Sequence, residues 1–152
     1  MRGARRLIVN ADDFGQSPGV NRGIVEAHEH GIVTSASLMV RWPAAAEAAA
    51  YGRAHPAFAL GLHVDLGEWM YRDDRWVALY EVVDLDDEQS IAGEVLHQLE
   101  RFRELAGREP THIDSHQHVH LRQAAHIVSA VAETLRIPLR QCSSDILYCG
   151  RF

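Results

Sequence analysis

Histidine and aspartate side chains gather at three places in this 152-residue chain. Asp12 and Asp13 are adjacent and follow a short apolar run, whereas His63 lies within a second apolar run. His116 and His118 belong to a third segment, which is rich in histidine. Two imidazoles and one carboxylate can hold a metal ion and leave coordination positions open for water and substrate. The sequence therefore predicts a catalytic metal site built from one of the two aspartates, His63, and one or both of the two later histidines.

The second aspartate of the pair has a separate expected role. A carboxylate that does not bind the metal is free to act as a general base on metal-bound water, whose pKa the ion lowers. The ordinary interpretation of Asp12 and Asp13, a helix cap or a solvated turn, stays open. A buried histidine such as His63 is also often a hydrogen-bonded core residue.

Alternation along two expected strands indicates which side chains share a face. His63 and Asp65 lie on one face of a strand at residues 59–66, opposite four apolar side chains. In a strand at residues 111–119, the ionisable side chains fall on even positions: His112, Asp114, His116, His118 and, just beyond it, His120. Such a row is costly to bury unless the groups are paired or bind a metal. A solvated strand edge is the alternative.

The remaining pattern predicts an α/β fold with a parallel sheet, because strands alternate with helices. Strands are expected at residues 7–9, 34–40, 59–66, 111–119 and from 139, and helices at 17–30, 43–54, between Asp87 and Gly107, and around 127–135. Residues 67–86 are expected to form a long excursion with a short hairpin. In parallel α/β folds functional groups lie at the carboxyl ends of the strands, where the candidate residues fall. No dinucleotide-binding or P-loop motif follows a strand.

Composition limits the partners and the location. The formal net charge is -6 and the pI is about 5.9, which disfavours nucleic acid and acidic membranes as partners. The apolar runs are shorter than the ~18 residues of a membrane span. The basic start leads into a strand and not a signal segment, so we expect a cytoplasmic protein of one domain, residues 1–152. Cys142 and Cys149 match no metal or redox spacing.

Three motifs together resemble the YdjC-like carbohydrate deacetylase family. They are Asn10–Gly15, Gly61–His63 and Thr111–His120, and the resemblance extends over nearly all of residues 6–122. It implies a distorted, TIM-like (β/α) barrel, of which this chain would hold about five βα units, and a divalent metal, Mg²⁺ or a Zn²⁺-like ion. It also implies removal of N-acetyl groups from acetylated amino sugars such as chitooligosaccharides.

The resemblance assigns roles to particular residues. Asp13, His63 and His116 would be the metal ligands, and Asp12 would deprotonate the attacking water. His118 is a candidate proton donor to the leaving amine. No other cofactor is expected.

Family members run to roughly 250 residues, the length of a complete barrel, and this chain is shorter. An inactive remnant that binds a metal or a glycan is therefore an alternative, and an open barrel predicts a homodimer. A metal-dependent phosphoesterase would use the same ligands, but Arg140 is the only basic residue expected near a later strand end. Four aromatic residues would suit a sugar-stacking lip or ordinary loop packing: Trp69, Tyr71, Trp76 and Tyr80.

Overall fold

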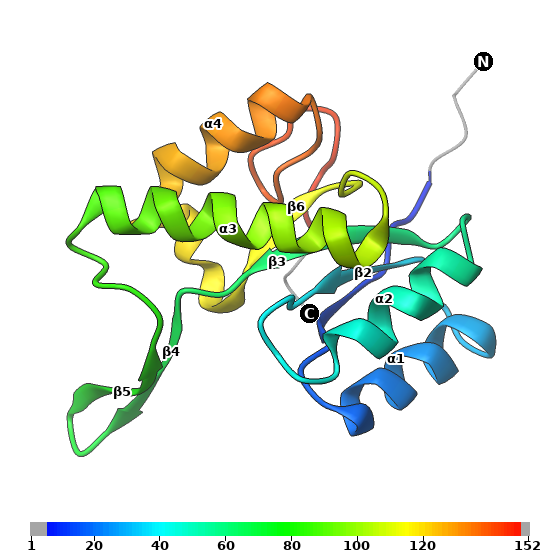
Figure 1. Cartoon of the computed structure of the whole chain (residues 1–152), viewed down its shortest axis with the longest axis horizontal. Coiled ribbons are helices and arrows are strands. Elements are labelled where there is room, and N and C mark those ends of the chain that lie inside the picture. The colour runs from blue at the N-terminus through cyan, green and yellow to red at the C-terminus, as the bar shows by residue number, and fades with distance from the viewer. Residues whose placement is uncertain (1–5, 150–152) are drawn as a thin grey trace.

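The computed structural model describes residues 6–149 and contains a four-stranded parallel sheet (Figure 1). Its strands lie side by side in the order β1 (Asn10–Phe14), β2 (Ser35–Leu38), β3 (Ala59–Val64) and β6 (Ile113–Ser115). Beyond β6, Leu139 forms a single parallel bridge with Ile113, where a fifth strand is expected. The α/β class with a parallel sheet is therefore confirmed.

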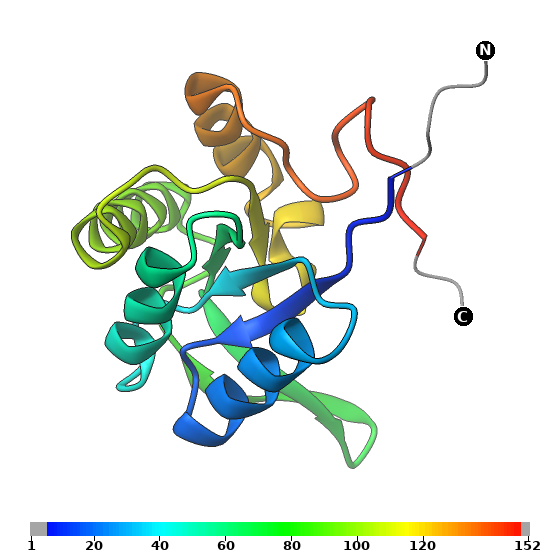
Figure 2. The same ribbon diagram turned by 90° about the vertical axis from the view of Figure 1, so that its right-hand side faces the viewer.

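The helices that connect these strands are α1 (Pro18–Glu29), α2 (Ala45–Ala54), α3 (Glu88–Ala106) and α4 (Ala125–Leu135). The strand order never reverses along the chain, so right-handed crossovers place successive helices on the same side of the sheet. Figure 2 shows this arrangement, with the helices gathered on one side and the other side facing the last segment of the chain.

Local sequence signals explain where the helices begin and end. The Ser17 hydroxyl accepts a hydrogen bond from the backbone of Val20 at the start of α1. Asp87 caps α3 in the same way, and Gly107 ends that helix in the left-handed conformation that glycine adopts most readily. These three predicted helix ends are confirmed.

The two faces of the sheet have opposite chemistry. The face under the helices is apolar and fully buried, and it includes Ala36, Leu38, Leu60, Leu62, Val64 and Ile113. The opposite face carries polar side chains from all four strands: Asn10, Ser35, Ser37, His63 and Asp114. Alternation along each strand thus separates a hydrophobic core from a row of groups that can do chemistry.

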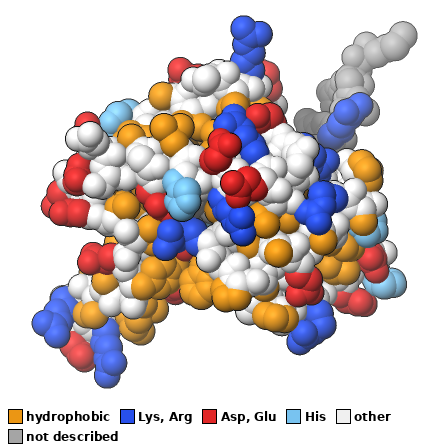
Figure 3. Space-filling view, viewed as in Figure 1, with side chains coloured by type: hydrophobic (Ala, Val, Ile, Leu, Met, Phe, Trp, Pro, Cys, Tyr) orange, Lys and Arg blue, Asp and Glu red, His pale blue; other side chains and the backbone are white. Residues whose placement is uncertain are grey.

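A two-stranded antiparallel hairpin leaves the body of the protein between β3 and α3 (Figure 1). Its strands are β4 (Gly67–Arg72) and β5 (Arg75–Glu81). The Gln117 side chain forms two hydrogen bonds with the backbone of Trp69, which fasten the base of the hairpin to the segment after β6. Figure 3 shows hydrophobic side chains along the hairpin and basic ones near its tip.

Two of the expected strands are wrong in their extent. The first strand begins at Asn10, and Leu7 and Ile8 are exposed, because none of the described elements covers them. The expected strand at 111–119 stops at Ser115, and a 3-10 turn, η1 (His116–Leu121), follows it. Gln117 and His118 have left-handed backbone angles there, so the row of even-numbered side chains does not continue along one face.

Within the described residues, none of the helices combines the length and the apolar character that crossing a membrane requires. Cys142 and Cys149 are both exposed, and neither forms a disulfide.

Candidate metal centre

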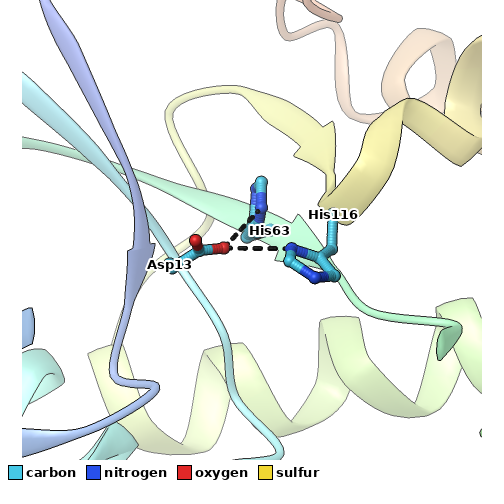
Figure 4. A group of neighbouring side chains, drawn as sticks. All are labelled: Asp13, His63 and His116. Carbon is cyan, nitrogen blue, oxygen red and sulfur yellow. Dashed lines mark hydrogen bonds and ion pairs between the residues drawn. The ribbon is translucent and has the colours of Figure 1, made fainter. Parts of the chain in front are cut away.

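Asp13, His63 and His116 meet at the carboxyl ends of β1, β3 and β6 (Figure 4). Oδ1 of Asp13 lies 3.2 Å from Nε2 of His63 and 3.1 Å from Nδ1 of His116. One ligand atom from each residue lies within 4.8 Å of the other two, which is close enough for all three to contact one ion. The His63 ring is buried, and the Asp13 side chain is 34% exposed. The donor set therefore fits a divalent cation with further positions open to solvent.

Strand ends and turns explain why these side chains converge. Asp13 has a left-handed φ of 63°, which breaks the alternation of β1 and lets two adjacent aspartates serve the same end of the sheet. His116 is the first residue after β6, so it points from the turn and not from the strand. The register of β3 and β6 pairs His63 with Asp114, which fixes the position of His63, the third candidate ligand.

The carboxylates and imidazoles of the centre shift one another's pKa. Hydrogen bonds with His116 and His63 hold the pKa of Asp13 well below its usual range. Burial opposes a charge on His63, but hydrogen bonds to Asp114 and Asp13 outweigh it and raise its pKa to about 9. The hydrogen bond to Asp13 also raises the pKa of His116. An imidazole must release its proton to bind a metal, so metal binding here is coupled to proton release.

Each of the two histidines has a second carboxylate behind it. Nδ1 of His63 lies 2.6 Å from Oδ1 of Asp114, which is fully buried. Nε2 of His116 is buried, and no described group forms a hydrogen bond with it, but Oε2 of Glu68 lies 3.6 Å away. A carboxylate on the far nitrogen of a metal-binding histidine orients the ring and increases its basicity. Asp114 lies at hydrogen-bond distance for this role toward His63, and Glu68 of the hairpin lies near His116 for the same role.

A polar network on the inner face holds Asp114 in place. The Ser37 hydroxyl donates to Oδ2 of Asp114 at 2.7 Å and lies 3.1 Å from Nε2 of His112. Asn10 donates to the same hydroxyl from β1. The His112 ring lies directly over Gly61, where an added Cβ would come within 2.4 Å of it. Glycine is therefore required at this position for the network to pack as it does.

Asp12 is held by a different partner from the rest of the centre. NH1 of Arg140 donates to Oδ2 of Asp12 at 2.7 Å, and NH2 donates to Oδ1 at 2.5 Å. NH2 of Arg140 also lies 2.5 Å from Oδ2 of Asp114. Asp12 does not belong to the group formed by Asp13, His63 and His116, so the pair of aspartates divides into one candidate ligand and one candidate base.

Other residues that the alternation grouped with the site lie outside it. His118 is exposed, and its ring packs against that of His120, which is buried and bonded to Ser115. Asp65 is buried and accepts hydrogen bonds from Trp42 and from the hydroxyl of Tyr80.

Tyr80 is therefore not part of an exposed aromatic lip. Its pKa is raised by burial and by the neighbouring Asp65. Tyr71 and Trp76 are exposed and contact each other across the hairpin, with their ring centroids 5.6 Å apart.

Sequence reasoning missed the supporting residues. Ser37 and Asn10 could have been found from the alternation of polar and apolar residues in β1 and β2. Glu68 carries no signal in the sequence, because its position depends on the docking of the hairpin. The sequence offers Arg140 as a phosphate ligand, whereas the structure pairs it with two carboxylates.

Comparison with known proteins identifies the class. The model of the YdjC-like protein family matches residues 6–151, so the chain belongs to this family. The chain is 45% identical to a chitooligosaccharide deacetylase of Klebsiella pneumoniae and 40% identical to one of Serratia marcescens, over 90% and 88% of its own length. A carbohydrate deacetylase of Geobacillus stearothermophilus is 40% identical over 90% of the chain.

The chain is also similar in fold to a solved structure whose description differs from those of these relatives. A crystal structure from Enterococcus faecalis V583, described as that of a proposed cellobiose-phosphate cleavage protein, has a TM-score of 0.73 and 30% identity over 91% of this chain. The chain spans 58–59% of the length of the three deacetylases and 59% of the solved chain.

Proposed function

We propose that this chain is a metal-dependent hydrolase that removes N-acetyl groups from acetylated amino sugars, with chitooligosaccharides as the substrate class. The proposal rests on one observation above all: Asp13, His63 and His116 converge on a single point at the carboxyl ends of three strands. The names of the relatives, which are carbohydrate and chitooligosaccharide deacetylases, supply the reaction and the substrate class.

Asp13, Nε2 of His63 and Nδ1 of His116 would hold one divalent ion, Mg²⁺ or Zn²⁺. When bound, such a cation acts as a Lewis acid that polarises the acetamide carbonyl and makes water more acidic. Two nitrogen donors with one oxygen donor suit zinc, whereas magnesium prefers oxygen ligands. Asp114 would keep the proton on Nδ1 of His63, so that Nε2 faces the ion.

Asp12 would act as the general base, and its hydrogen bonds indicate which atom accepts the proton. A carboxylate has about four acceptor sites, two on each oxygen. Among the described residues, Oδ1 accepts from Arg140 and from Asn10, while Oδ2 accepts from Arg140 alone. The free acceptor site is therefore on Oδ2, and the Asp12 side chain is 40% exposed, which lets water reach it.

Attack of water on the acetamide carbonyl carbon gives a tetrahedral species. When its C–N bond breaks, acetate and an amine are released, and the amine nitrogen must gain a proton as it leaves. Asp12, once protonated at Oδ2, is a donor within the centre itself. The sequence suggests His118 for this step, but its exposed ring contacts His120 and is not part of the cluster around Asp13.

The fold and domain expectations remain part of the proposal. The unreversed strand order and the helices on one side of the sheet support a barrel-type arrangement, in which residues 1–152 form one domain. A homodimer and a cytoplasmic location are proposed on sequence grounds alone. A phosphoesterase is disfavoured, because Arg140 is already paired with Asp12 and Asp114.

The test is acetate release from diacetylchitobiose by the purified chain, after chelation and again after addition of Zn²⁺ or Mg²⁺. We expect release that depends on the metal and is lost in His63→Ala but kept in the matched variant His118→Ala. Metal binding without acetate release would instead favour the inactive metal- or glycan-binding protein. Release that is indifferent to chelation would refute the proposed chemistry.

A further inference from the structure

Arg140 is fixed by its backbone as well as by its side chain. It follows Leu139, which bridges to Ile113 of β6, and its own N–H donates to the Ile113 carbonyl at 3.0 Å. Its side chain is only 14% exposed. A guanidinium held in this way cannot turn out into solvent without breaking three contacts with carboxylate oxygens, which belong to Asp12 and Asp114.

The guanidinium lies between carboxylates, at a position that would favour a cation even without Arg140. Asp12, His63 and Asp114 form a second group whose ligand atoms all lie within 4.8 Å of one another, beside the group that contains Asp13. Two carboxylates of this group face Arg140. Paired acidic sites of this kind hold the second ion in two-metal hydrolases. Here the positive charge comes from the chain itself.

We propose that Arg140 is a built-in cation that fills the second cation position between Asp12 and Asp114. It limits the centre to one metal ion, and it holds Asp12 with the second acceptor site of Oδ2 left to accept a proton. The first part of this inference concerns metal binding alone. The second part rests on the proposed function, because it needs Asp12 to be the base.

Removing the guanidinium leaves two carboxylates close together, and Asp114 among them is fully buried. A buried carboxylate that has lost its partner is unfavourable, and a divalent ion from solvent relieves it. Arg140→Met keeps the apolar stem of the side chain and should therefore bind a second ion. Arg140→Lys keeps the charge, but an ammonium cannot contact both oxygens of Asp12 as the planar guanidinium does.

The experiment counts Zn²⁺ bound per chain by calorimetric titration of the chelator-treated full chain, with folding checked by circular dichroism. We expect one ion in the wild type, in Arg140→Lys and in the control Arg101→Met, which removes an exposed arginine paired with Glu104. We expect two ions in Arg140→Met and one again in Asp12→Asn/Arg140→Met. One ion with unchanged affinity in Arg140→Met would overturn the inference.

Acetate release by Arg140→Lys tests the positioning role of Arg140. This measurement can still be made if Arg140→Met does not fold. Loss of an orienting partner should lower kcat by about 10-fold or more with little change in KM. Adding Arg140→Lys to Asp12→Asn should cause no further loss, because both changes act through one carboxylate. Additive losses would overturn the positioning role. If the wild type releases no acetate, the proposed function fails, and the ion count still decides the role of Arg140.

Discussion

The buried pair of His63 and Asp114 should make the stability of the metal-free protein depend on pH. The folded pKa of His63 is about 9, above the ordinary value of 6.5. A raised pKa stabilises the folded state fully below the unfolded pKa, and this stabilisation is lost as the pH rises through the folded pKa. A shift of this size corresponds to about 3 kcal/mol, nearly all of which should disappear between pH 6 and pH 9.5.

Asp114→Asn tests this reasoning, because it keeps the shape of the side chain and removes the charge that His63 faces at 2.6 Å. The free energy of unfolding is measured with urea, in the presence of a chelator, at intervals from pH 6 to pH 9.5. The wild type should lose clearly more stability over this range than Asp114→Asn. Other groups, His116 among them, titrate in both proteins, so the difference between the two curves reports the loss of the Asp114 charge, which His63 faces through a hydrogen bond and His112 and His120 through charge alone.

Asp65→Asn is the matched control, since Asp65 is as buried as Asp114 but its hydrogen bonds are with Trp42 and Tyr80, and it acts on His116 only through its charge. Its curve should stay closer to that of the wild type than to that of Asp114→Asn. Parallel curves for Asp114→Asn and the wild type would refute the account of the pair. A steeper loss of stability in Asp114→Asn would refute it equally.

Three further predictions concern the surroundings of the metal centre. Glu68→Ala should weaken Zn²⁺ binding by about 10-fold, because His116 loses the carboxylate behind it. The affinity is measured by competition with a chelating dye, and an unchanged value would show that Glu68 does not support the centre. His118→Ala should leave that affinity unchanged, since its ring lies outside the cluster of ligands, and a loss would show that sequence reasoning was right about it. Gly61→Ala should lower the free energy of unfolding by roughly 1–3 kcal/mol or more, because its Cβ would overlap the ring of His112; full stability in urea would contradict that packing.

The parts of the fold that the sequence predicts depend on local physics. Ser17, Asp87 and Gly107 end helices through contacts with residues a few positions away. The alternation along β3 places His63 opposite the apolar side chains because a buried strand has only two faces. The strand ends also predict that the candidate ligands gather at one place, since Asp13 lies at the end of β1 and His116 directly follows β6. The choice of Asp13 over Asp12 and of His116 over His118 comes from the family resemblance.

The parts that could not be predicted depend on contacts between distant residues. The chain turns after Ser115 because its hydroxyl bonds with His120 and because Gln117 holds the backbone of Trp69 on the hairpin. Asp12 and Arg140 are 128 positions apart and meet only because α4 returns the chain to β6. Sequence spacing predicts neither the turn after Ser115 nor the contact between Asp12 and Arg140. The supporting residues of the centre can therefore be identified only from the tertiary structure.

The most direct test of the central claim is a calorimetric titration of the chelator-treated chain with Zn²⁺, carried out on the wild type and on His116→Ala. Asp13, His63 and His116 together should bind one ion per chain, and binding should fall below detection when the third ligand is lost. The account is contradicted if the folded wild type binds no ion, or if His116→Ala binds one with unchanged affinity.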